Sequence, residues 1–107
     1  MIARVWRGRA NGHNAPHYRA HATQRVFPSL KSLPGHRGAY LLEREARGEV
    51  EFLAVTLWDG VDAIKAFSGD DPEVAIVEPE ARAVLSDFDD FARHYEVVGA
   101  ADVPLAH

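Results

Sequence analysis

The spacing of hydrophobic residues changes from a strand pattern to a helix pattern in the middle of the chain. Residues 52–57 (FLAVTL) form an apolar run that ends at Trp58, and its aliphatic and β-branched content predicts a strand. Val61, Ile64 and Phe67 then recur at three-residue steps, which predicts a helix with one apolar stripe. A strand that leads directly into an amphipathic helix is therefore expected at the centre of the fold.

The flanking segments add three strands and an early helix. These elements are expected at residues 1–9 (strand), 15–27 (helix), 39–45 (strand) and 91–98 (strand). A hairpin turn at Arg47-Gly48 connects the second strand to the apolar run. The order β-α-β-β-α-β predicts an α+β fold of ferredoxin-like topology, with a four-stranded antiparallel sheet covered on one face by helices.

Two later segments have weaker patterns. Asp71-Pro72 predicts the start of a second short helix, with a carboxylate at the cap and proline at the first position. Residues 78–90 are acidic and carry one weak helical pattern, so they are expected to form a solvated loop. Residues 1–98 are expected to form one domain, and residues 99–107 a C-terminal tail.

The returning strand at residues 50–58 is apolar on both faces. Such a strand is expected where both faces of its sheet are covered. Two helices can cover only one face, so the other needs a partner. The sequence therefore predicts a homodimer in which two sheets pack face to face.

Composition excludes several classes of partner. The 107-residue chain has a formal net charge of −4 and no cysteine, and no run of basic residues suggests a nucleic-acid surface. No apolar run approaches the roughly 20 residues that span a bilayer, so no membrane association is expected. The N-terminus carries three arginines in nine residues and lacks the apolar core of a signal peptide. A cytoplasmic location is expected.

Three histidines, His13, His17 and His21, lie four residues apart. Histidines at this spacing on a helix can hold a divalent metal. Pro16 disturbs the first helical turn, however, and no acidic residue accompanies the histidines on that face. The pattern favours a solvated surface stripe, and no metal site is expected.

Several of these segments together resemble one protein family. Residues 52–67, an aliphatic strand ending in tryptophan and followed by D-x-x-D-A-I-K-A-F, resemble the antibiotic biosynthesis monooxygenase (ABM) family. The resemblance continues at residues 34–38, 68–75 and 94–98. It implies a dimeric α+β barrel with a pocket between sheet and helices. It also implies activities that range from cofactor-free oxygenation of polycyclic phenols and quinols to haem degradation.

The haem-degrading members differ from this chain at three positions. They place an asparagine in the first strand, a tryptophan late in the helix after the third strand, and a ligating histidine about ten residues later. This chain has Trp6 and Arg7 in the first strand, then Phe67 and Val77 at the other two positions. Without an imidazole at the last position the iron lacks its expected axial ligand. Haem is disfavoured and no cofactor is expected, although another histidine could serve.

The leading functional hypothesis is a cofactor-independent monooxygenase that acts on a small or polycyclic aromatic phenol or quinol. His94 or a bound water would remove the phenol proton, and Trp58 and Phe67 would hold the rings. Tyr40 and Arg37 would stabilise a phenolate. The alternative is that Trp58 and His94 are packed core residues. A second functional hypothesis is a non-catalytic dimeric protein that binds a small aromatic molecule in the same pocket and needs no proton-transfer residue.

Overall fold

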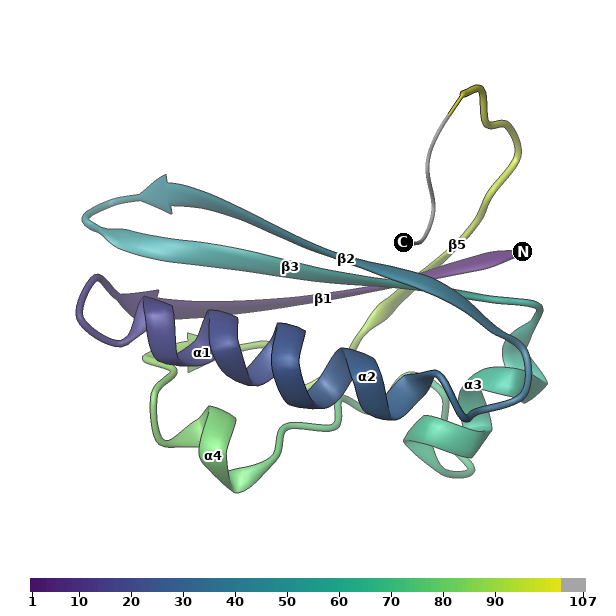
Figure 1. Cartoon of the computed structure of the whole chain (residues 1–107), viewed down its shortest axis with the longest axis horizontal. Coiled ribbons are helices and arrows are strands. Elements are labelled where there is room, and N and C mark those ends of the chain that lie inside the picture. Colours follow the sequence, from purple (N-terminus) through teal and green to yellow (C-terminus); the bar gives the residue numbers. More distant parts are fainter. Residues whose placement is uncertain (103–107) are drawn as a thin grey trace.

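The computed structural model describes residues 1–102, which form one antiparallel sheet with helices on a single face (Figure 1). The long strand β1 (Ile2–Asn11) pairs with β3 (Glu49–Trp58), which pairs in turn with β2 (His36–Ala46). On its other side β1 pairs with two short strands, β4 (Asp87–Phe88) and β5 (Arg93–Glu96). The α+β class and the ferredoxin-like arrangement are confirmed.

The fourth strand is divided in two, which the sequence did not predict. Between β4 and β5 the chain turns away from β1 and pairs with residues 73–75 instead. Ala75 N donates to Asp90 O (2.9 Å), and Ala92 N donates to Glu73 O (2.8 Å). The same pairing corrects the expectation of a helix beginning at Asp71-Pro72, because these hydrogen bonds hold the chain extended where a helix was expected.

The long hairpin β2–β3 is as predicted. Arg47 and Gly48 lie at its turn and both have positive φ angles, 54° and 80°. Two successive left-handed residues are characteristic of the tight hairpin turns that match strand twist. Residues 99–102 follow β5 without regular structure. The predicted domain boundary at residue 98 stays a prediction, and residues 103–107 of the predicted tail lie outside the described residues.

One helical rod runs alongside the long strands on the covered face of the sheet (Figure 1). It comprises α1 (Ala15–His21), a π-helical turn (Ala22–Val26) and α2 (Phe27–Leu30). Pro28 has no N–H to donate to the preceding turn, which favours the wider π turn before it. Two further helices, α3 (Val61–Ser68) and α4 (Pro79–Arg82), lie on the same side of the sheet. Among the described residues no helix is long and apolar enough to cross a membrane.

Alternation along β1 and β3 separates the two faces of the sheet. Arg4, Trp6 and Ala10 lie on the helix-covered face and are buried, as are Phe52 and Trp58 of β3. The opposite face is also largely apolar, and no helix covers it within residues 1–102. Its side chains include Val5, Tyr40, Leu42, Leu53, Val55, Leu57 and Tyr95.

Candidate functional site

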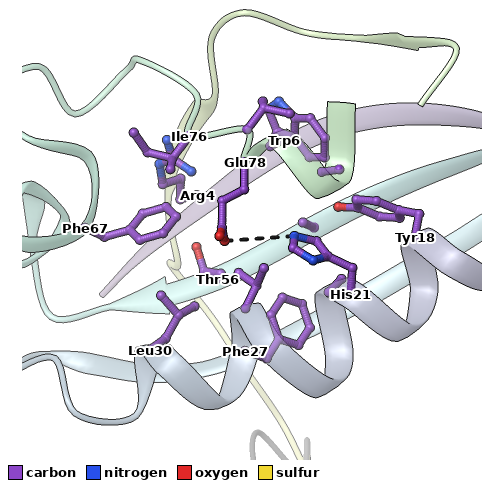
Figure 2. Close-up of a pocket in the computed structure, with 15 residues that line it drawn as sticks. Arg4, Trp6, Tyr18, His21, Phe27, Leu30, Thr56, Phe67, Ile76 and Glu78 are labelled. Atoms are coloured by element: carbon purple, nitrogen blue, oxygen red, sulfur yellow. Dashed lines mark ion pairs between the residues drawn. The ribbon is translucent and has the colours of Figure 1, made fainter. Parts of the chain in front are cut away.

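A pocket lies between the helical rod, the sheet and the chain around α4 (Figure 2). Its walls are mainly apolar and aromatic, with a cavity volume of about 50 Å³. That space holds a few water molecules, since one water needs roughly 10–15 Å³ by this measure. The polar lining residues are Arg4, Tyr18, His21, Thr56 and Glu78.

Arg4 is the most deeply placed charge in this pocket. It follows the inward alternation of β1 and is only 5% exposed. Its Nη2 donates to the carbonyl oxygen of Val74 at 2.8 Å, and its guanidinium carbon lies 5.2 Å from the Phe67 ring centroid. Its Nε is buried without a hydrogen-bond partner among the described residues. Burial lowers the pKa of Arg4 to about 10, because desolvation disfavours the charged form.

His21 and Glu78 face one another across the pocket (Figure 2). His21 comes from the last turn of α1 and is 9% exposed. Its Nε2 lies 3.9 Å from the Glu78 carboxylate. One ring nitrogen of His21 and one carboxylate oxygen each of Glu78 and Glu80, the atoms that could ligate a metal ion, all lie within 4.8 Å of one another. The expected solvated histidine stripe is therefore wrong for His21, because tertiary packing buries this ring and brings the carboxylates of Glu78 and Glu80, at the start of α4, beside it.

Of the two aromatic residues predicted to hold a substrate, one lines the pocket and the other lies behind it in the core. Phe67 lines the pocket. Trp58 is fully buried behind it, with the two ring centroids 6.2 Å apart and the planes inclined by 26°. The Trp58 Nε1 donates to Thr56 Oγ1 at 2.8 Å within the core. Trp58 therefore supports the ring of Phe67 and does not itself line the pocket.

The other three predicted site residues do not converge on the pocket. His94 pairs with Arg4 in the β1–β5 register and lies outside the pocket lining. Its Nε2 is buried without a partner in the described chain, and burial, then the charge of Arg4, lower its pKa. Tyr40 lies on the opposite face of the sheet. Arg37 pairs with Asp59 at the surface, where both side chains are about half exposed.

Sequence reasoning missed Arg4, His21 and Glu78 as pocket residues. The alternation of β1 could have identified Arg4, because side chains two residues apart point to the same face of a strand. Arg4 therefore lies on the same buried face as Trp6 and Ala10. In the sequence, His21 is distinguished only by its four-residue spacing from His17. Glu78 carries no local signal, because only the tertiary path after α3 brings it to the helical rod.

Similarity to known proteins is detectable through structure. No protein-family profile matches the sequence, and no curated protein matches it. A candidate antibiotic biosynthesis monooxygenase from Deinococcus radiodurans superposes with a TM-score of 0.67 at 16% identity, over 97% of this chain and 99% of that one. The haem degrader MhuD of Mycobacterium tuberculosis, with two haems in its active site, superposes with a TM-score of 0.64 at 19% identity, over 94% and 99%.

These structures correct one prediction. An arginine-to-serine variant of MhuD holds two manganese protoporphyrins per active site at a TM-score of 0.64, so two porphyrin-bound neighbours share this fold. The expectation that haem is disfavoured and that no cofactor is used is therefore withdrawn as wrong. It rested on three sequence positions, and it overlooked the pocket imidazole of His21. At the level of the fold, the resemblance to the ABM family is confirmed: the chain has the architecture of the antibiotic biosynthesis monooxygenase structures.

Proposed function

We propose that this chain is an ABM-type oxygenase that oxidises a small aromatic phenol or quinol in the pocket between sheet and helices. The supporting observation is a pocket with aromatic walls and a few convergent polar groups, the usual composition of a small-molecule site. Trp6, Tyr18, Phe27 and Phe67 form the aromatic walls, and the convergent polar groups include Arg4, His21 and Glu78.

The proposed chemistry begins with removal of a proton from the bound substrate. The resulting electron-rich anion reduces dioxygen. At an aryl methylene carbon, one oxygen atom becomes a carbonyl and the other leaves as water, so one dioxygen is consumed per substrate. His21 is our candidate base, because its ring lines the cavity and Glu78 is placed to stabilise the imidazolium. His94 remains the alternative base, behind Arg4 in β5.

Substrate entry requires the pocket to enlarge. Its volume of about 50 Å³ is below the roughly 300 Å³ at which small-molecule sites begin. The chain around α4 is the expected moving part, because α4 spans only Pro79–Arg82 and closes one side of the cavity through Glu78 and Ala81. Outward movement of this segment would open the cavity while the sheet and helical rod stay in place.

We also propose that two copies pair through the uncovered sheet face. Leu42 and Tyr95 on this face are 50% and 53% exposed, and the partly exposed Val5, Leu53 and Val55 extend the apolar surface between them. An apolar sheet face of this kind is a typical site of association. Size-resolved scattering should give twice the chain mass, and a monomer at micromolar concentration would contradict the proposal.

The oxygenase proposal is tested by oxygen uptake across a panel of anthrones and hydroquinones, with and without added haemin. We expect uptake with at least one substrate, and loss of most of it in His21→Ala. His17→Ala is the matched control, because His17 lies one helical turn away on α1 and is exposed. Binding without uptake in the wild type would favour the non-catalytic binding protein. Loss in His94→Ala but not in His21→Ala would assign the base to His94.

Haem binding is the second candidate, and His21 is the observation that favours it. The imidazole is suited to iron ligation, and Arg4 is suited to a propionate. The cavity of about 50 Å³ does not fit a porphyrin in this conformation, so no reaction step is assigned to haem here. A haemin titration should give a Soret band that His21→Ala abolishes and His17→Ala retains. A wild type that gives no such band excludes this candidate.

A further inference from the structure

Arg4 is a buried cation without a counter-ion in the described chain. The ion pairs formed by the described residues all use other cations. Glu78 lines the same pocket, but it lies within ion-pair distance of His21 and not of Arg4. A buried arginine is ordinarily paired, because desolvation of an unpaired charge is among the largest penalties in folding.

The contacts that Arg4 does make leave part of its guanidinium available. Nη2 is occupied by the carbonyl oxygen of Val74, and the ring of Phe67 lies beside the guanidinium. Nε has no acceptor among residues 1–102 although it is fully enclosed. A cation–π contact and one neutral carbonyl compensate the charge only partly. Arg4 therefore lacks an anionic hydrogen-bond acceptor within residues 1–102, and its side chain lines the pocket, where a ligand could supply one.

We infer that Arg4 binds a carboxylate carried by an aromatic ligand. A guanidinium edge presents parallel N–H donors whose geometry matches the two oxygens of a carboxylate. The aromatic part of such a ligand would lie against Phe67 next to Arg4, once outward movement of the chain around α4 has enlarged the cavity of about 50 Å³. This inference rests on the proposed pocket but not on oxygenase chemistry.

Matched acid and amide ligands test this inference in the absence of turnover. Calorimetry would compare 2-naphthoate with neutral 2-naphthamide, which has nearly the same shape. We expect the wild type to bind the carboxylate at least about tenfold more tightly, the scale of a charge-assisted hydrogen bond. In Arg4→Met this preference should disappear while amide binding persists. Arg19→Met should keep it, because Arg19 pairs with Glu43 on the surface, away from the pocket.

Several outcomes would overturn the inference. Equal binding of acid and amide by the wild type, or binding of neither, would show that Arg4 does not select a carboxylate. Retention of the preference in Arg4→Met would place the anion elsewhere, and tighter binding of 4-nitrophenolate than of naphthoate would assign a phenolate instead.

If Arg4→Met does not fold, Arg4→Lys should fold and show a reduced preference for the carboxylate over the amide, because lysine lacks the planar fork. An unreduced preference in Arg4→Lys would contradict the bidentate geometry. Oxygen uptake is measured separately, so failure of either proposal is distinguishable from failure of the other.

Discussion

The guanidinium carbon of Arg4 lies 5.2 Å from the ring centroid of Phe67, and this pair joins the apolar wall of the pocket to its buried charge. Arg4 comes from the central strand and Phe67 from the helix that follows β3. Trp58 also packs against Phe67. The position of the Phe67 ring therefore depends on the core as well as on the pocket.

Truncation of Phe67 should affect stability and binding together. We expect Phe67→Ala to lower the free energy of unfolding by roughly 2–4 kcal/mol, because it removes packing against Trp58 and leaves a cavity. It should also weaken binding of 2-naphthoate. Phe91→Ala is the matched control, since Phe91 is 61% exposed and its loss should cost about 0.5 kcal/mol or less. Urea denaturation measures both variants, and equal losses would contradict the packing role of Phe67.

The hydrogen bond from Trp58 to Thr56 should couple these two residues. Thr56→Val leaves the buried indole N–H without an acceptor, which should cost about 1–3 kcal/mol of folding stability. In the Trp58→Phe background the same change should cost much less, because no donor remains to be satisfied. A double-mutant cycle by chemical denaturation measures the difference. An equal cost in the two backgrounds would show that the 2.8 Å contact contributes little.

Gly8 should tolerate no side chain. A Cβ at this position would lie 2.8 Å from Cη2 of Trp6, so the buried indole would have to shift. We expect Gly8→Ala to lower the free energy of unfolding by roughly 1–3 kcal/mol, the usual cost of overpacking. Gly12→Ala is the control, because a Cβ there meets no heavy atom within 4 Å. Thermal denaturation would contradict this expectation if the two variants melted at the same temperature.

Stability should fall as the pH drops below about 6.5, the ordinary pKa of a histidine side chain in an unfolded chain. Burial lowers the pKa of His94 and of His36 in the folded state. The unfolded chain therefore binds more protons between the folded and unfolded pKa values, and stability rises with pH across that window. His94→Gln should flatten the slope between pH 7 and pH 5, whereas exposed His17→Gln should not. Denaturant titrations at several pH values measure the slopes, and an unchanged slope in His94→Gln would contradict the assignment.

The stability contributed by carboxylates that pair with arginine should be lost only in a lower pH range. Hydrogen bonds from Arg37 and Arg19 lower the pKa of Asp59 and of Glu43, respectively. Their contribution is present above the unfolded pKa near 4 and is lost at lower pH. Because these groups are exposed pairs, their individual effects should be small. The loss of stability between pH 7 and pH 5 therefore belongs to the histidines.

The sequence alone determined the elements whose patterns are local. The apolar run ending at Trp58, the three-residue spacing of Val61, Ile64 and Phe67, and the Arg47-Gly48 turn each concern residues close along the chain. Strand alternation, helix periodicity and turn geometry act over a few residues, so these elements and the α+β class followed from the pattern. The ferredoxin-like topology followed from the order of these segments, whereas the ABM family was suggested by the resemblance of residues 52–67 and the segments around them.

Tertiary structure alone decided the division of the last strand and the composition of the pocket. Residues 73–75 take the backbone partners that would have continued the strand between β4 and β5, and no local pattern reports that competition. Arg4, His21 and Glu78 come from three distant segments, and they meet because the helical rod and the chain around α4 cover the same face of the sheet. Burial then converts an ordinary strand arginine into an uncompensated charge, since desolvation depends on what packs above a residue and not on its neighbours in sequence.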